Sequence, residues 1–164
     1  MQKYLGVKFV EAKPMSLGDY NNHRGWTIPA NEDPYAHGYL VRYPDGYESW
    51  CPKGQFEAAN RITSGLSFGH AIEAAKKGSK IARRKWNGKD MFVVYMPPLA
   101  LPPYNTADTS RKVNDRTAKF IGEDQPLNCQ PYFAMFNAQK EWIPGWLASQ
   151  SDMLDDDWYI LEDE

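Results

Sequence analysis

Four short runs of β-forming residues constrain the fold of this chain most. They are KIARR (80–84), MFVVYM (91–96), YFAMFN (132–137) and WYIL (158–161). Each run is too short for a typical helix, and turn-forming residues such as Asn87-Gly88 separate neighbouring runs. Short strands joined by turns pair in the antiparallel direction. The sequence therefore predicts an antiparallel sheet in the second part of the chain.

A few short helices are predicted beside this sheet. Ser67 is a good N-cap for a helix over FGHAIEAAKK, and Gly78 ends it. Residues 97–131 are rich in proline, but the piece VNDRTAKFIG within them has helical spacing. Ser149 or Ser151 is expected to cap a short helical turn around residues 152–154.

Residues 1–62 are predicted to form a separate small module, because the Thr63-Ser64-Gly65 sequence interrupts the pattern. Its expected elements are a strand at 3–10, a helical turn at 16–22 ended by Gly25, a hairpin around Pro44-Asp45-Gly46, and a helix from Pro52 to about Ile62. The predicted fold class is α+β: an antiparallel sheet with a few short helices in domain 63–164, preceded by the small α+β module 1–62.

Charge is distributed unevenly along the chain. Residues 1–62 carry no net charge, residues 63–151 carry +5, and residues 152–164 carry −7. This distribution argues against a protein that coats a nucleic acid polymer, since such a protein needs a sustained basic face. It permits a local basic pocket for one or two phosphates.

Aromatic residues make up 14% of the chain. Most such rings are expected in a core or an oligomer interface, and some can serve as stacking surfaces for flat ligands.

The two cysteines, Cys51 and Cys129, lie far apart and outside any metal-binding spacing. Free thiols in a cytoplasmic protein are the expected state. The first residues lack the apolar stretch of a signal peptide, and no segment reaches the ~18 apolar residues of a membrane span. The expected location is the cytoplasm, without membrane contact.

No catalytic, metal or cofactor site is expected. His23, His37 and His70 are scattered, and none belongs to a recognised catalytic or metal motif. The acidic run 155–157 lacks the alternation and the glycine of a calcium loop. We expect this run to be a solvated turn.

Two segments carry the residue types of a binding site. ARRKWNG (82–88) places three cations beside Trp86, which suits phosphates and a flat ring. PGWLASQSDML (144–154) places Trp146 before small polar residues at a helix start, where backbone N–H groups suit anions. An exposed basic turn and a capped helical turn, each with its tryptophan in the core, are the alternatives.

Residues 66–161 resemble the Thoeris anti-defence two family of phage proteins. The resemblance rests on LSFGHAIEAAKKGSKIARRKWNGKDMFVVYMP and QPYFAMFNAQKEWIPGWLASQSDMLDDDWYILE, and the W-L-A-S-Q-x-D segment is its most specific part. Residues 1–62 resemble a small phage accessory family of unknown function.

The resemblance implies a protein that binds a signal molecule without degrading it. Family members sequester a cyclic ADP-ribose isomer made by bacterial TIR-domain enzymes, and some also bind cyclic dinucleotides. They assemble as homotetramers with the ligand pocket between subunits. The residue match, together with the basic cluster, gives the expected ligand-binding residues: Arg83, Arg84, Trp86, Asn87, Trp146, Ala148, Ser149, Gln150 and Asp152.

Two other functions stay open at this point: a hydrolase of the same signal, and a structural or protein-binding phage accessory protein. The segment 98–130 is longer than its counterpart in the smallest family members, so it can reshape or cover the pocket.

Overall fold

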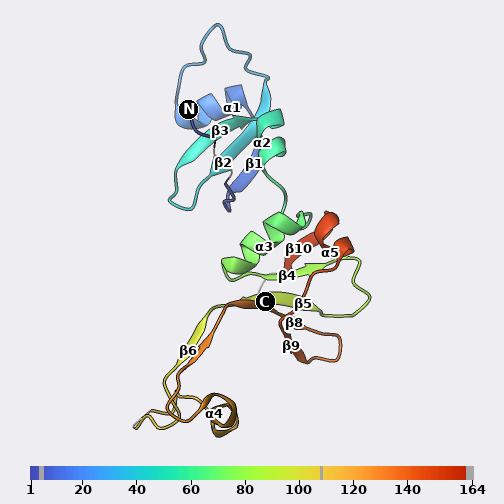
Figure 1. Cartoon of the computed structure of the whole chain (residues 1–164). Coiled ribbons are helices and arrows are strands. Elements are labelled where there is room, and N and C mark those ends of the chain that lie inside the picture. Colours follow the sequence, from blue (N-terminus) through green and yellow to red (C-terminus); the bar gives the residue numbers. More distant parts are fainter. Residues whose placement is uncertain (4–5, 108, 162–164) are drawn as a thin grey trace. The chain divides into compact units, whose positions relative to one another are not determined.

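The computed structural model describes residues 1–3, 6–107 and 109–161. The chain divides into two compact units, Met1–Ile62 and Thr63–Glu164 (Figure 1). Each unit has its own sheet and its own buried residues, so each is described by itself.

The first unit is a three-stranded antiparallel sheet with two helices. Its elements are β1 (Glu11–Ser16), α1 (Leu17–Arg24), β2 (His37–Arg42), β3 (Glu48–Pro52) and α2 (Lys53–Ala59), and the strand order is β1-β2-β3. Tyr20, Leu40 and Val41 are its buried apolar residues, and Leu40 and Val41 lie on opposite faces of β2. The predicted hairpin is confirmed as β2–β3, and the predicted helix end is confirmed at Gly25, whose φ of 69° is left-handed.

The strand predicted at 3–10 is wrong within the described residues, and Tyr4 and Leu5 lie outside them. Residues 6–10 form no strand, and β1 begins at Glu11. Glu11 pairs with Arg42, the last residue of β2, so the β1–β2 ladder begins at Glu11. The second helix also ends at Ala59, earlier than the predicted Ile62.

The second unit contains a five-stranded antiparallel sheet. Its strands are β4 (Lys80–Arg83), β5 (Phe92–Met96), β8 (Tyr132–Phe136), β9 (Trp142–Pro144) and β10 (Trp158–Leu161), in the order β10-β4-β5-β8-β9. All four predicted runs form strands, which confirms the α+β fold class. The edge strand β9 was not predicted, because three residues that include a proline carry too little pattern.

One helix, α3 (Phe68–Lys76), packs on the sheet. Its alanines Ala71, Ala74 and Ala75 are buried against Ile81, Val93, Met135 and Trp158. Ser67 occupies the N-cap position, but its side chain accepts no bond from the helix backbone; its Oγ lies 2.7 Å from Nδ1 of His70. The small alanine side chains allow the helix to approach the sheet closely.

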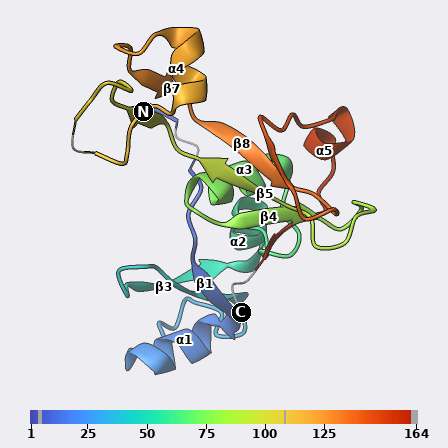
Figure 2. The ribbon, with the colours of Figure 1, turned by 90° about the horizontal axis from the view of Figure 1, so that it is seen from below.

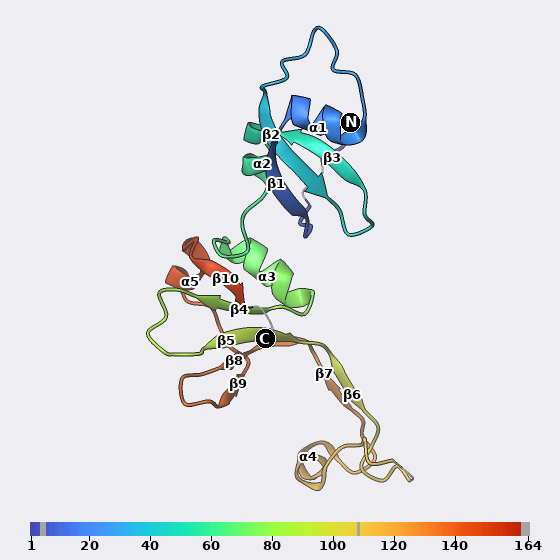
Figure 3. The same cartoon turned by 180° about the vertical axis from the view of Figure 1, so that it is seen from behind.

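The proline-rich segment 97–131 forms an arm. A two-stranded ribbon, β6 (Leu99–Leu101) paired with β7 (Leu127–Cys129), leads to α4 (Asp115–Ile121) at its end. The predicted helical piece is confirmed as α4, and Asn114 caps it by accepting from the Thr117 N–H. Figures 2 and 3 show the arm leaving the sheet at the ends of β5 and β8.

Within the described residues, no helix combines the length and apolar character that crossing a membrane requires. The same residues contain no group of three or more His, Cys, Asp or Glu side chains placed to hold a metal ion.

Candidate functional site

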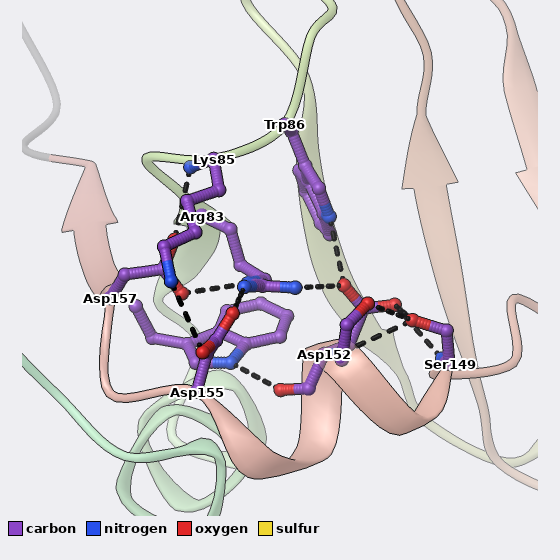
Figure 4. Close-up of polar contacts among 9 residues, drawn as sticks. Arg83, Lys85, Trp86, Ser149, Asp152, Asp155 and Asp157 are labelled. Atoms are coloured by element: carbon purple, nitrogen blue, oxygen red, sulfur yellow. Dashed lines mark hydrogen bonds and ion pairs between the residues drawn. The ribbon is translucent and has the colours of Figure 1, made fainter.

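The last residue of β4, Arg83, lies at the centre of a buried charge network (Figure 4). Its side chain is 3% exposed. Nη1 donates to Oδ1 of Asp152 at 2.7 Å, Nε donates to Oδ1 of Asp157 at 2.8 Å, and Nη2 pairs with Asp155. One guanidinium therefore binds three carboxylates from α5 (Gln150–Leu154) and from the turn that follows it.

The sequence builds this network through the alternation of an extended segment. Asp155 and Asp157 are two residues apart, so both point toward Arg83, while Asp156 between them is exposed. The prediction of a solvated turn is therefore right for Asp156 and wrong for its two neighbours. The physical reason is that a buried Arg83 needs partners for its N–H groups.

Asp152 connects Arg83 to both predicted binding segments. Its Oδ1 also accepts from the indole Nε1–H of Trp86 at 3.0 Å. Its Oδ2 accepts from the backbone N–H of Ser149 at 2.9 Å and from the Ser149 hydroxyl at 2.7 Å. Ser149 accepts in return from the Asp152 N–H, which confirms Ser149 as the N-cap and completes a capping box.

These contacts set the ionisation of the carboxylates. Burial raises the pKa of Asp152, but hydrogen bonds from Arg83, Ser149 and Trp86 outweigh it and lower the pKa to about 2. Burial also raises the pKa of Asp157. Hydrogen bonds from Arg83 and from the Lys85 backbone N–H outweigh burial, so the pKa of Asp157 is lowered. Both groups are therefore carboxylates at neutral pH, and neither is suited to accept a proton.

The cations of the ARRKWNG segment are engaged with neighbours. The Lys85 ammonium lies 3.2 Å from Asp155, and Arg83 is enclosed by the network. The Arg84 guanidinium lies over the Tyr159 ring, 5.7 Å from its centroid, and donates to the Ser64 carbonyl at 2.9 Å. Arg83 is therefore buried rather than part of an exposed basic turn, and Arg84 contacts Ser64 and Tyr159.

Three tryptophans meet beside this network. Trp86, Trp146 and Trp158 contact one another edge to face, with ring centroids 5.4–6.2 Å apart. Trp158 is fully buried, and its Nε1–H donates to the Asp152 carbonyl at 2.8 Å. The other two are half-buried, so each packs on the core and still presents part of its ring to solvent.

Sequence reasoning missed Trp158, Asp155 and Asp157. The pairing of β10 with β4 places Trp158 opposite Arg83, and no local sequence pattern contains that pairing.

The loop between β4 and β5 presents Asn87. Asn87 is exposed, whereas Gly88 is half-buried, and a side chain at Gly88 would meet Met91 and would lie 2.8 Å from Cβ of Ala138. The expected tight turn at Asn87-Gly88 is wrong in detail: the left-handed residue is Asp90, with φ 59°, and Gly88 is needed for close packing instead.

The structure therefore brings together five of the expected residues and leaves the others around them. Arg83, Trp86, Trp146, Ser149 and Asp152 belong to the connected group. Ala148 is half-buried and Gln150 exposed at the start of α5, and Asn87 is exposed beside Trp86.

Together, the fold and this site define an antiparallel α+β domain in which Trp86, from the loop after β4, and Trp146, from the segment before α5, lie beside a network built on a buried arginine. The sequence model of the Thoeris anti-defense 2-like domain family matches residues 66–161, and the chain belongs to this family. One relative is Thoeris anti-defense 2 of Bacillus phage SP01, which is 31% identical over 96 residues, covering 58% of this chain and 94% of the relative. The family membership supports a role in phage anti-defence.

Proposed function

We propose that this protein binds a cyclic ADP-ribose isomer and holds it without cleaving it, so that the signal does not reach its immune effector. The observation that carries the proposal is the pair of half-buried indoles, Trp86 and Trp146, beside the exposed polar side chains Asn87 and Gln150. Indole faces stack with a flat base, and amide side chains can hydrogen-bond its edges.

The charge network supports the proposal as a rigid base for the site. Asp152 holds the Trp86 indole through its Oδ1 and the start of α5 through its Oδ2. Both oxygens are fully engaged, so the two ligand-facing segments are fixed before any ligand arrives. We assign Arg83 and Asp152 a supporting role, because their polar groups are already paired within the protein.

The phosphates of the ligand need cations that this network does not supply. Arg83 and Lys85 face three carboxylates, and the capping box already uses N–H groups at the start of α5. A pocket completed by a second copy of the chain resolves this deficit, which is consistent with a homotetramer that places its pockets between subunits. Cyclic dinucleotides, which offer the same bases and phosphates, are the second ligand class to test.

Retention without cleavage is consistent with the state of the carboxylates. A hydrolase needs a group that can accept a proton near neutral pH. Asp152 has a pKa of about 2, and Asp157 has a lowered pKa, so neither can act as that base.

Calorimetric titration of the full-length protein with a cyclic ADP-ribose isomer tests the proposal. We expect binding, and we expect mass spectrometry to recover the ligand intact after the protein is denatured. Trp86→Ala should weaken binding by about 1–3 kcal/mol, the usual value of one stacked base, or about 5- to 150-fold in Kd.

The matched control is Trp26→Ala, which removes a 54% exposed indole from the other unit. It should leave the affinity unchanged. A cleaved ligand would point to the hydrolase, and no binding of any nucleotide would point to a structural or protein-binding role. Circular dichroism must first show that each variant is folded.

A further inference from the structure

The first unit contains a cavity that lies outside the candidate nucleotide site. Its volume is about 410 Å³, and it lies at the end of the sheet where β1 ends and β2 begins. The lining residues come from β1, α1, β2 and the start of α2, and all of them belong to Met1–Ile62. Cavities of this size hold small organic molecules in many proteins. A ligand in this cavity is therefore independent of the nucleotide proposed for the other unit.

The register of the sheet brings four of the lining side chains to one face. Ser16 pairs directly with His37. Pro14 pairs with Tyr39 two positions away along each strand, so all four side chains lie on the same face. α2 packs on this face as well, because Phe56 stacks on the Tyr39 ring with centroids 4.3 Å apart. The cavity therefore lies on the face of the sheet that carries α2.

The Tyr39 ring forms a fixed apolar wall of the cavity. The ring is held by the stack with Phe56, and its hydroxyl donates to Oε1 of Glu57 at 2.8 Å. The hydrogen bond with Glu57 raises the pKa of Tyr39 above its ordinary value, so the phenol is uncharged at neutral pH. Tyr39 therefore offers apolar ring surface to a ligand and no charge.

Two nitrogen-bearing side chains of the cavity have no partner. Lys53, the first residue of α2, and His37 are both exposed, and neither side chain forms a hydrogen bond, ion pair or ring contact among the described residues. The three arginines of the same unit differ in this respect, since each contacts a ring, a carboxylate or a backbone carbonyl. Lys53 and His37 are therefore available to a negatively charged group.

Asp19 supplies the opposite charge. It lies in the first turn of α1, where its Oδ2 accepts from the Ser16 hydroxyl at 2.8 Å and its backbone N–H donates to Ser16 Oγ at 3.1 Å. These two bonds orient the Asp19 side chain. Its Oδ1 has no hydrogen-bond partner within the part of the chain that the structure describes. Asp19 can therefore accept from a positively charged group.

We propose that this cavity binds a free α-amino acid with an apolar side chain. The ligand carboxylate pairs with Lys53 and accepts from the His37 ring N–H, and the ligand ammonium donates to Asp19. The ligand side chain lies against Tyr39 and Pro14. A simple anion such as phosphate meets the charge of Asp19, and a simple amine leaves Lys53 without a partner. A molecule with both charges and an apolar group matches all of these side chains.

NMR titration of the isotope-labelled full-length protein with L-phenylalanine tests this proposal. We expect saturable shifts of the backbone amide signals of Ser16, His37 and Tyr39. The dissociation constant should be on the order of 1 mM, because the ligand is small and the charged side chains are exposed. Lys53→Gln and Asp19→Asn should each raise it about 2- to 5-fold, the usual value of one exposed ion pair. The dispersion of the same spectra shows whether each variant is folded.

Lys13→Gln is the matched control, since Lys13 precedes Pro14 on the opposite face of β1 and pairs with Leu40. It should leave the dissociation constant unchanged. Phenethylamine, which lacks the carboxylate, and acetate, which lacks the ammonium and the ring, should both bind more weakly than L-phenylalanine.

The absence of shifts at about 10 mM L-phenylalanine would overturn the proposal. An equal weakening of binding by Lys13→Gln would overturn it too, because the site would then not be this cavity. Inorganic phosphate that binds as tightly as L-phenylalanine and is lost in Lys53→Gln would identify a simple anion site instead. Equal binding of phenethylamine would likewise show that the ligand carboxylate is not recognised.

Discussion

At the scale of single residues, Asp152 connects three segments of the domain. It accepts hydrogen bonds from β4, from the loop that follows β4 and from the start of α5, and it is 7% exposed. Removing one partner of a buried ion pair leaves the other charge buried without a counter-charge. The loss of folding free energy is then larger than the net stabilisation that the intact pair provides.

We expect Asp152→Ala to destabilise Thr63–Glu164 by about 3–5 kcal/mol, because Arg83 loses a partner inside the protein. Urea denaturation followed by tryptophan fluorescence measures this loss. Asp156→Ala, at an exposed position in the same acidic run, should change stability by less than about 0.5 kcal/mol. Equal effects of the two substitutions would mean that the network does not stabilise the fold.

The pKa of Asp152 predicts how stability depends on pH. This pKa is lowered from 3.8 to about 2, so the folded state holds the proton less tightly than the unfolded state does. The stability from this group is present above about pH 4 and is lost as the pH falls through 2, by ~2.5 kcal/mol in total. Denaturation at pH 4, 3 and 2 should show this slope in the wild type and a flatter one in Asp152→Asn.

At the scale of elements, the sequence predicted those with a strong local pattern. The strands β4, β5, β8 and β10 and the helices α3 and α4 follow from periodicity and capping residues. The strand at 3–10 was wrong within the described residues, where the first strand begins at Glu11, opposite the last residue of β2. Pairing partners are tertiary facts, which a single local pattern does not contain.

In the candidate site, too, local patterns predicted some residues, whereas the role of others depends on tertiary contacts. Trp86, Trp146 and Ser149 stood out because tryptophans and caps have recognisable local neighbours. The burial of Arg83 did not, because it depends on carboxylates about 70 positions further along the chain. A run of charged residues in a sequence predicts solvent-exposed side chains. Only the folded structure shows which of these side chains form ion pairs.

The arm leaves the sheet at one register pair, Met96 and Tyr132. Joining these residues through an Asn-Gly turn in place of 97–131 closes β5 and β8 as a two-residue hairpin. We expect the shortened protein to fold and to unfold in one cooperative transition, because the buried residues of the sheet lie outside the arm. Thermal melting by circular dichroism checks this, and loss of the transition would mean that the arm supports the sheet.

At the scale of the whole molecule, the division after Ile62 predicts that the second unit can act alone. A fragment that begins at Thr63 keeps the bond from the Ile160 N–H to the Thr63 carbonyl and the bridge between Leu66 and Trp158. We expect it to fold and to bind the cyclic nucleotide with the affinity of the full chain.

Calorimetric titration of the fragment and of the full-length protein with the same ligand makes this comparison. A soluble, folded fragment with no affinity would show that residues 1–62 help to build the pocket. Aggregation of the fragment would show instead that these residues cover apolar surface.

The three indoles beside Asp152 also give the domain an intrinsic spectroscopic signal. Their centroids lie 5.4–6.2 Å apart, close enough for their excited states to couple. Such coupling gives a far-ultraviolet circular dichroism couplet that depends on the angles between the rings. A base stacked on Trp86 would change that signal and quench the emission, so occupancy can be followed in an unlabelled protein.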